Sequence, residues 1–221
     1  AGFRTLLVGF ESGSPRILHN IKKMATQEHN TKCLDIARNP KYPLNVKALM
    51  SLGHPGESRE TIAETRRWLT ETRPWEADFT IITPYPGSNY YDHALPAEGL
   101  MQDGKQVYIY TCKTPFIKGE EPDRLYTFDV DYVETTSYYK GDPNAVVLSD
   151  VYTDYLSPEE LVRERNALET AIRGNLGIPY HRRGDPIDYD ALNYGHSMGQ
   201  TRVFPERMLK VSKNAPADLR V

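Results

Sequence analysis

The stretch from Leu44 to Ser58, LNVKALMSLGHPGES, decides the fold class of this chain. Its first part, up to Leu52, is an apolar run of strand length, and the Gly-His-Pro-Gly turn that follows leads to Ser58, a residue type that caps helix N-termini. A helix is expected from Ser58 to about Arg73, because Pro74 breaks it. Strand, turn and helix in this order predict a βα unit.

The same pattern recurs on both sides of this stretch. Upstream, Phe3–Phe10 (FRTLLVGF) predicts a strand, Ser14 before Pro15 predicts a capped helix start, and a further helix is expected over about Thr26–Ala37. Downstream, Ala77–Thr83 (ADFTIIT) predicts a third strand. Strands that alternate with helices favour a parallel α/β sheet, which places ligands at the carboxyl ends of its strands.

The pattern changes after about Leu95. Lys105–Thr111 predicts a strand, whereas Gly119–Asp150 is rich in Tyr, Asp and turn residues and yields no assignment. Ser157–Glu160 is a capping box with proline at the first helical position, so a helix begins there. Pro205–Met208 predicts a last short helix.

Composition excludes several classes of protein. The 221 residues include 27 basic and 30 acidic side chains, a balance that draws the chain neither to nucleic acid nor to an anionic membrane. No apolar run is long enough to span a bilayer and no signal peptide is visible, so we expect a cytoplasmic protein. The two cysteines, Cys33 and Cys112, lack the spacing of a zinc or iron–sulfur site and hold no metal alone.

Three strand endings resemble those of the radical S-adenosylmethionine (radical SAM) enzymes. Gly9–Ser14 (GFESGS) resembles the fourth-strand ending of that family, Leu49–Ser58 (LMSLGHPGES) the fifth, and Thr83–Ser88 (TPYPGS) the sixth. Each motif alone is weak, but their order and spacing are specific. The resemblance is greatest to the branch that carries a cobalamin-binding domain ahead of its barrel.

The resemblance implies an α/β fold: the second half of a partial (β/α)6 TIM-like barrel with parallel strands, followed by an α+β C-terminal extension. Residues 1–95 would supply strands four to six, and residues 96–221 a cap over the substrate. The family's Cys-x-x-x-Cys-x-x-Cys loop is absent from this sequence, and strands one to three are absent with it. The expected partners are therefore the N-terminal half of the barrel and a small-molecule substrate.

The parent enzyme is expected to cleave S-adenosylmethionine to a 5′-deoxyadenosyl radical. It would use an iron–sulfur cluster whose ligands lie outside this chain, and cobalamin for methyl transfer if the cobalamin-dependent branch applies. The isolated chain is expected to be inactive, because the cysteines that bind the cluster are absent.

The resemblance assigns cofactor contacts to residues at the strand ends, and no catalytic residue. Glu11 and Ser12 would bond the ribose or the amino group of S-adenosylmethionine. Leu52 and Gly53 would flank the adenine, and the loop at Tyr85 and Pro86 would line the same pocket. The plainer alternatives are that Ser12 supports the next helix, that Glu11 pairs with a basic side chain, and that the Pro-rich loop is only a rigid turn.

Other polar and aromatic groups are less specific. His54 is the histidine on the predicted ligand face, where it would touch substrate or cobalamin, although a lone histidine is more often hydrogen-bonded core. The acidic residues Asp129, Asp131 and Glu134 are expected to lie on a solvated edge strand and not to bind a metal. A cluster of tyrosines could line a substrate pocket, but a role in core and interface packing is expected. Its members are Tyr126, Tyr132, Tyr138, Tyr139 and Tyr152.

Two further functions stay open. The first is a non-catalytic subunit that binds a partner, which an uncovered strand edge at Phe3–Phe10 would favour. The second is an α/β nucleotide-binding module that uses the helix start at Gly53–Ser58.

Overall fold

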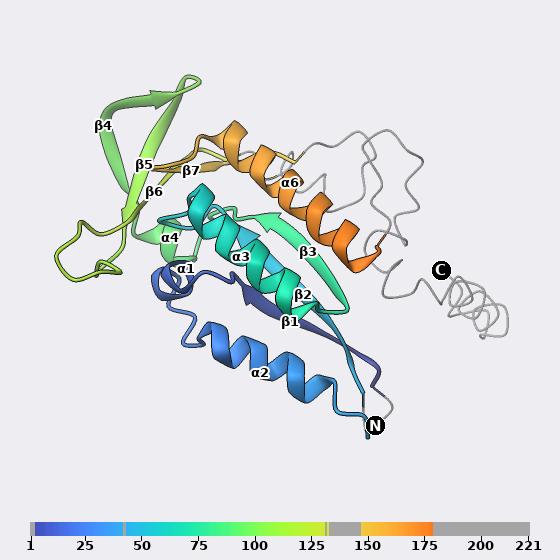
Figure 1. Cartoon of the computed structure of the whole chain (residues 1–221). Coiled ribbons are helices and arrows are strands. Elements are labelled where there is room, and N and C mark those ends of the chain that lie inside the picture. The colour runs from blue at the N-terminus through green and yellow to red at the C-terminus, as the bar shows by residue number, and fades with distance from the viewer. Residues whose placement is uncertain (1–2, 42, 131, 133–146, 179–221) are drawn as a thin grey trace, which may run out of the picture.

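The computed structural model describes residues 3–41, 43–130, 132 and 147–178 (Figure 1). Two sheets organise them, a parallel sheet of order β1-β2-β3 and an antiparallel sheet of order β4-β5-β6-β7. The elements in chain order are β1 (Thr5–Glu11), α1 (Pro15–Asn20), α2 (Gln27–Ala37), β2 (Asn45–Leu52), α3 (Arg59–Thr72), β3 (Glu76–Ile81), α4 (Asn89–Asp92), β4 (Leu95–Gln102), β5 (Lys105–Thr111), β6 (Arg124–Phe128), β7 (Val151–Thr153) and α6 (Pro158–Leu176). The predicted α/β class is confirmed; the partial (β/α)6 barrel stays a prediction.

The parallel sheet has one apolar face and one polar face. Strand side chains alternate between faces, and in β2 the residues Val46, Ala48, Met50 and Leu52 are buried in the main hydrophobic core. The opposite face, which we call the polar face, carries two groups of bonded side chains. Lys47 pairs with Glu76 and Asp78, and the Ser51 hydroxyl donates to Glu11.

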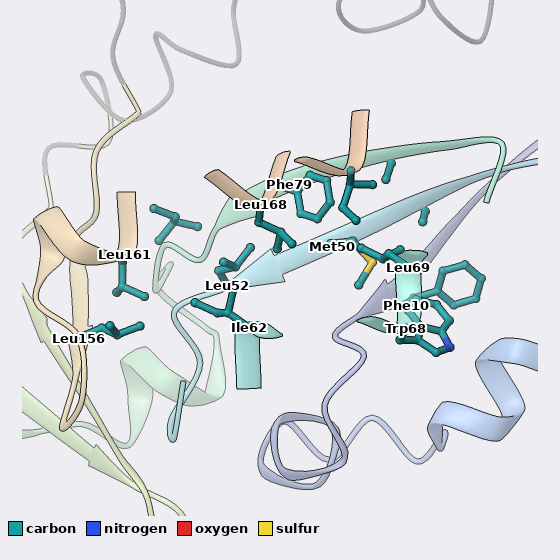
Figure 2. Close-up of a cluster of buried hydrophobic side chains, with 14 of the residues drawn as sticks. Phe10, Met50, Leu52, Ile62, Trp68, Leu69, Phe79, Leu156, Leu161 and Leu168 are labelled. Carbon is teal, nitrogen blue, oxygen red and sulfur yellow. The ribbon is translucent and has the colours of Figure 1, made fainter. Parts of the chain in front are cut away.

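The hydrophobic core joins the parallel sheet to the helices and to the antiparallel sheet. Phe10 of β1 meets Trp68 of α3 edge to face, with ring centroids 5.4 Å apart. Figure 2 shows this pair at one end of the cluster and Leu156 and Leu161 at the other. One buried cluster thus includes residues from both sides of the predicted boundary at 95/96, and that boundary stays a prediction.

The helix starts follow their capping signals with one exception. The side chains of Ser58 and Ser157 accept the predicted capping hydrogen bonds from Thr61 N–H and Glu160 N–H. The helix start at Ser14 is confirmed, but its predicted side-chain cap is wrong, since the Ser14 hydroxyl makes no capping bond. The Ser14 N–H instead donates to the hydroxyl of Ser12, 3.1 Å away.

Helix α6 covers the β3 side of the parallel sheet (Figure 1). Arg165 of α6 donates two hydrogen bonds to the carbonyl oxygen of Phe79 in β3, at 2.9 and 2.7 Å. Its guanidinium also pairs with Glu169, and Arg173 bridges Glu169 to Asp78 of the polar face. These contacts anchor α6 along the last strand of the sheet.

The opposite edge of the parallel sheet, at β1, is unpaired among the described residues. There β1 pairs only with β2. The Leu7 side chain is 62% exposed, and Phe3 before the strand is 72% exposed. On the helix-facing side of this edge lies an apolar groove of about 320 Å³, lined by residues of β1, α2 and the loop before β2: Leu6, His29, Lys32, Cys33, Ile36, Ala37 and Leu44.

The antiparallel sheet was predicted only at β5. Strand β4 escaped prediction because Pro96 and Gly99 interrupt it, and both residue types are uncommon inside strands. Strands β6 and β7 are short and lie in or beside the stretch that yielded no assignment; Tyr126 and Tyr152 stack across them with centroids 4.6 Å apart.

Some predictions concern residues outside those that the structure describes. These are Asp131, Glu134, Tyr138, Tyr139 and the short helix at 205–208. No helix among the described residues combines the length and the apolar character needed to cross a membrane.

Candidate functional site

Polar side chains from several segments meet at the carboxyl end of the parallel sheet. Glu11 ends β1, and Ser51 is the last residue but one of β2. His54 follows β2, Lys23 lies between α1 and α2, and Tyr90 belongs to α4. Hydrogen bonds and one ion pair join these five residues into a single chain of contacts, which we call the Glu11 network.

The Glu11 carboxylate is held through both oxygens. Lys23 Nζ lies 3.0 Å from Oε1, and the Ser51 hydroxyl donates to Oε2 at 2.8 Å. The Glu11 side chain remains 30% exposed. A carboxylate fixed in this way is an acceptor that solvent and a ligand can reach.

The backbone at Glu11 is in the left-handed region, with φ of 66°. A bulge in the β1–β2 pairing lies between Gly9 and Glu11, and it turns the Glu11 side chain back over Gly9. A Cβ atom at Gly9 would stand 2.6 Å from Glu11 Oε1. Glycine at position 9 therefore leaves the space that the carboxylate occupies. Backbone strain such as that at Glu11 is typical of functional sites.

His54 links Ser51 to Tyr90 inside the protein. Its Nε2 lies 2.7 Å from the Ser51 hydroxyl oxygen and its Nδ1 lies 3.1 Å from the Tyr90 hydroxyl. His54 is 6% exposed, and burial lowers its pKa from 6.5 to about 4, so the imidazole is neutral near pH 7. Burial also raises the pKa of Tyr90, which stays a phenol.

Glu57 stabilises the loop after β2 from within. Its carboxylate accepts hydrogen bonds from the Thr61 hydroxyl at 2.7 Å and from Gly53 N–H at 3.3 Å, and it is 2% exposed. The Thr153 hydroxyl donates to the Glu57 carbonyl oxygen. Burial raises the pKa of Glu57 from 4.5 to about 7 despite these donors.

Ser12 is tied into the protein interior. Its hydroxyl lies 3.0 Å from the Thr65 hydroxyl of α3 and accepts from Ser14 N–H. The residue is 2% exposed. The structure thus places Ser12 between β1 and α3, outside the Glu11 network.

The other predicted contacts are spread around the same strand ends. The Leu52 side chain belongs to the helix-facing core, and Gly53 follows it with φ of 86°. Tyr85 is 44% exposed and stacks on Tyr132, with centroids 5.3 Å apart, and Pro86 is exposed beside it. The structure joins Glu11 to His54 through Ser51, but it joins none of the other predicted contacts to them by a side-chain bond.

Sequence reasoning missed Lys23, Ser51 and Tyr90. Alternation along β2 was a usable signal for Ser51, since it lies on the same face as Lys47. Tyr90 contacts His54 across 36 residues of sequence, and no local pattern predicts that pairing.

No group of three or more metal-ligating side chains is found in the part of the chain that the structure describes. Cys33 is half-buried on α2, and Cys112 is buried just after β5. Burial raises the pKa of the Cys112 thiol to about 11, which keeps it protonated. These two cysteines are too few to hold an iron–sulfur cluster, which needs more protein ligands than two.

Comparisons with known proteins give one informative relative. No family model matches the chain. A Pyrococcus horikoshii protein called "Uncharacterized methyltransferase PH0819" is 26% identical over 185 residues, which cover 81% of this chain and 36% of that protein. The chain therefore spans well under half the length of the curated relative that it matches.

Proposed function

We propose that this chain is part of an S-adenosylmethionine-dependent methyltransferase, in which it holds the ribose or amino group of the cofactor. The observation that carries the proposal is the Glu11 network, an accessible carboxylate fixed at the carboxyl end of a parallel sheet. The similarity to a protein called a methyltransferase supports the same function.

The chemistry of the Glu11 network suits this ligand. Ribose hydroxyls and an ammonium group are hydrogen-bond donors, and the Glu11 carboxylate is an acceptor. Lys23 and Ser51 fix its direction. The adenine would lie against the backbone at Leu52–Gly53 and against the exposed loop at Tyr85–Pro86. Bound S-adenosylmethionine supplies an activated methyl group or, at a reduced iron–sulfur cluster, a 5′-deoxyadenosyl radical.

The finer proposal is that the complete protein is a radical SAM enzyme, with this chain as the second half of a partial (β/α)6 barrel. The sheet is covered by α6 beyond β3 and open beyond β1, so a preceding strand would pair there. The apolar groove between β1 and α2 would receive side chains of the preceding unit. Cluster ligands, and cobalamin if the enzyme uses it, would be held by that other part.

A partner-dependent, non-catalytic subunit is the second candidate, because it uses the same open edge of β1. The nucleotide-binding alternative has less support. At the helix start it would use, the N–H of Gly53 donates to Glu57, and the N–H of Glu57 donates to the His54 carbonyl oxygen. These backbone donors are already satisfied within the loop.

The test is product analysis on the protein expressed from its complete reading frame. The protein is purified and reconstituted with iron and sulfide without oxygen. It is then incubated, with and without dithionite, with S-adenosylmethionine labelled in its adenosyl group and a protein-free extract of the source cells, which supplies methyl acceptors. Mass spectrometry then measures 5′-deoxyadenosine and S-adenosylhomocysteine.

Three outcomes are distinguishable. Reductant-dependent 5′-deoxyadenosine supports the radical SAM proposal, whereas S-adenosylhomocysteine without reductant supports methyl transfer by a polar route. Neither product, together with no binding of S-adenosylmethionine, would overturn both proposals and favour the non-catalytic subunit.

A further inference from the structure

The hydrogen-bond directions in the Glu11 network follow from the chemistry of its members. A carboxylate only accepts hydrogen bonds, so the Ser51 hydroxyl donates its one hydrogen to Glu11. Ser51 must then accept from His54, which places the imidazole proton on Nε2. Because a neutral imidazole has one N–H, Nδ1 is an acceptor, and Tyr90 donates to it.

Tyr90 is itself held firmly. Its ring meets the ring of Tyr110 on β5 edge to face, with centroids 5.0 Å apart. The neighbouring residue Asn89 donates to the Tyr110 hydroxyl at 2.7 Å. The antiparallel sheet therefore fixes the position of α4. Helix α4 in turn fixes the Tyr90 hydroxyl, whose hydrogen bond sets the tautomer of His54.

We propose that His54 and Tyr90 are positioning residues, which hold the Ser51 hydroxyl as a fixed donor to Glu11 and so orient the Glu11 carboxylate toward its ligand. This inference rests on the proposed function for the identity of that ligand. All the hydrogen bonds of the relay run one way, from Tyr90 to Glu11. Without the Tyr90 hydroxyl, His54 could take the other tautomer, and Ser51 would lose the donor that directs its own hydrogen.

The first experiment removes a single oxygen atom. Tyr90→Phe keeps the ring contact with Tyr110 and deletes only the donor to His54. Tyr126→Phe is the matched control, since it deletes a tyrosine hydroxyl bonded to Asp154 on the antiparallel sheet, outside the network. Calorimetric titration of S-adenosylmethionine into the complete protein is expected to give a Kd roughly three- to tenfold higher for Tyr90→Phe. The control is expected to keep the wild-type Kd.

The second experiment does not depend on the cofactor. In protein labelled with 15N at histidine, the His54 ring is expected to show a proton on Nε2 and a hydrogen-bonded Nδ1. The Nδ1 resonance should move in Tyr90→Phe and stay in place in Tyr126→Phe. A side chain that served packing alone would leave the tautomer unchanged.

The outcomes separate this inference from the proposed function. Wild-type protein that fails to bind S-adenosylmethionine counts against the proposed function, while the nitrogen resonances still decide whether Tyr90 sets the state of His54. Wild-type binding with an unchanged Kd in Tyr90→Phe overturns the positioning role. A His54 proton on Nδ1 overturns the relay itself.

Discussion

Glu11 lies over the end of the parallel sheet in a backbone conformation that few non-glycine residues adopt. A positive φ at such a residue costs on the order of 1–3 kcal/mol, so the surrounding contacts must hold it. Lys23 and Ser51 supply two of those contacts, and Gly9 leaves the space. The fold thus keeps a strained residue at the point where the proposed ligand binds.

Gly9→Ala separates this local strain from overall stability. The added Cβ would meet Glu11 Oε1, the far end of a flexible side chain, so the carboxylate moves while the strand stays. We expect affinity for S-adenosylmethionine to fall about tenfold or more, with little change in the urea midpoint. The control is Gly174→Ala, an exposed helical site where the Cβ meets nothing within 4 Å; it should stabilise the protein by about 0.5–1 kcal/mol and leave affinity unchanged. Equal affinities in the two variants would contradict this account of Gly9.

The buried pair His54 and Glu57 predicts compensating pH effects. Glu57 has a folded-state pKa above its ordinary 4.5, so its contribution is full below pH 4.5 and is lost as pH rises through about 7. His54 has a folded-state pKa below its ordinary 6.5, so its contribution is full above pH 6.5 and is lost as pH falls through about 4. The two slopes oppose each other between pH 4.5 and 6.5.

Glu57→Gln should expose the slope that His54 contributes. Relative to wild type, the free energy of unfolding of this variant is expected to rise with pH between 4.5 and 6.5, by up to about 1.4 kcal/mol per pH unit. Urea denaturation at several pH values measures the difference, and His54→Gln should give the opposite slope. Curves for Glu57→Gln that run parallel to those of wild type would show that Glu57 ionises normally in the fold.

At the scale of elements, α6 is held to β3 by charged side chains that are almost fully buried. Arg165 bonds the Phe79 carbonyl oxygen and pairs with Glu169, and all these atoms lie inside the protein. Removing one partner of such a set leaves another charge buried and uncompensated. The contact therefore fixes where α6 lies along the sheet.

Arg165→Ala should lower the free energy of unfolding by about 3–5 kcal/mol. Arg163→Ala is the matched control on the same helix, because its side chain is 72% exposed and its pair with Glu160 spans 3.7 Å. That change should cost about 0.5 kcal/mol or less. Chemical denaturation of both variants measures the difference, and similar losses would mean that the buried ion pairs contribute little.

The elements of the parallel sheet were predictable because each carries a local signal. Leu44–Leu52 is an apolar run that ends at a turn, and the structure places β2 over Asn45–Leu52. The capping box at Ser157 likewise predicted α6. Strand β4 lacks such a signal, because Pro96 and Gly99 lie inside it and its pairing depends on β5.

The candidate site was predictable only in part. Glu11 could be named because it ends a strand in a recognisable motif. Its partners Lys23 and Ser51, and the Tyr90 contact with His54, depend on how separate segments meet in three dimensions. Ser12 lies beside Glu11 in sequence, but the bulge at Gly9–Glu11 and the bond to Thr65 turn it toward α3.

At the scale of the whole molecule, the two edges of the parallel sheet differ: the β3 edge is covered by a helix and the β1 edge is open among the described residues. Helix α6 lies along β3, while the open edge at β1 carries an apolar groove formed by Leu6 and residues of α2. An edge of this kind is a template for a further strand. The proposed enzyme would therefore be completed at β1, with the Glu11 network at the carboxyl end of the joined sheet.

Hydrogen exchange of the complete protein, measured by mass spectrometry with and without S-adenosylmethionine, tests the central claim most directly. We expect slower exchange in peptides that cover Gly9–Ser12, Ser51–His54 and Tyr85–Ser88, and no change in the hairpin of β4 and β5. Unchanged exchange in all three strand-end peptides at a saturating cofactor concentration, or protection confined to the hairpin, would contradict the account.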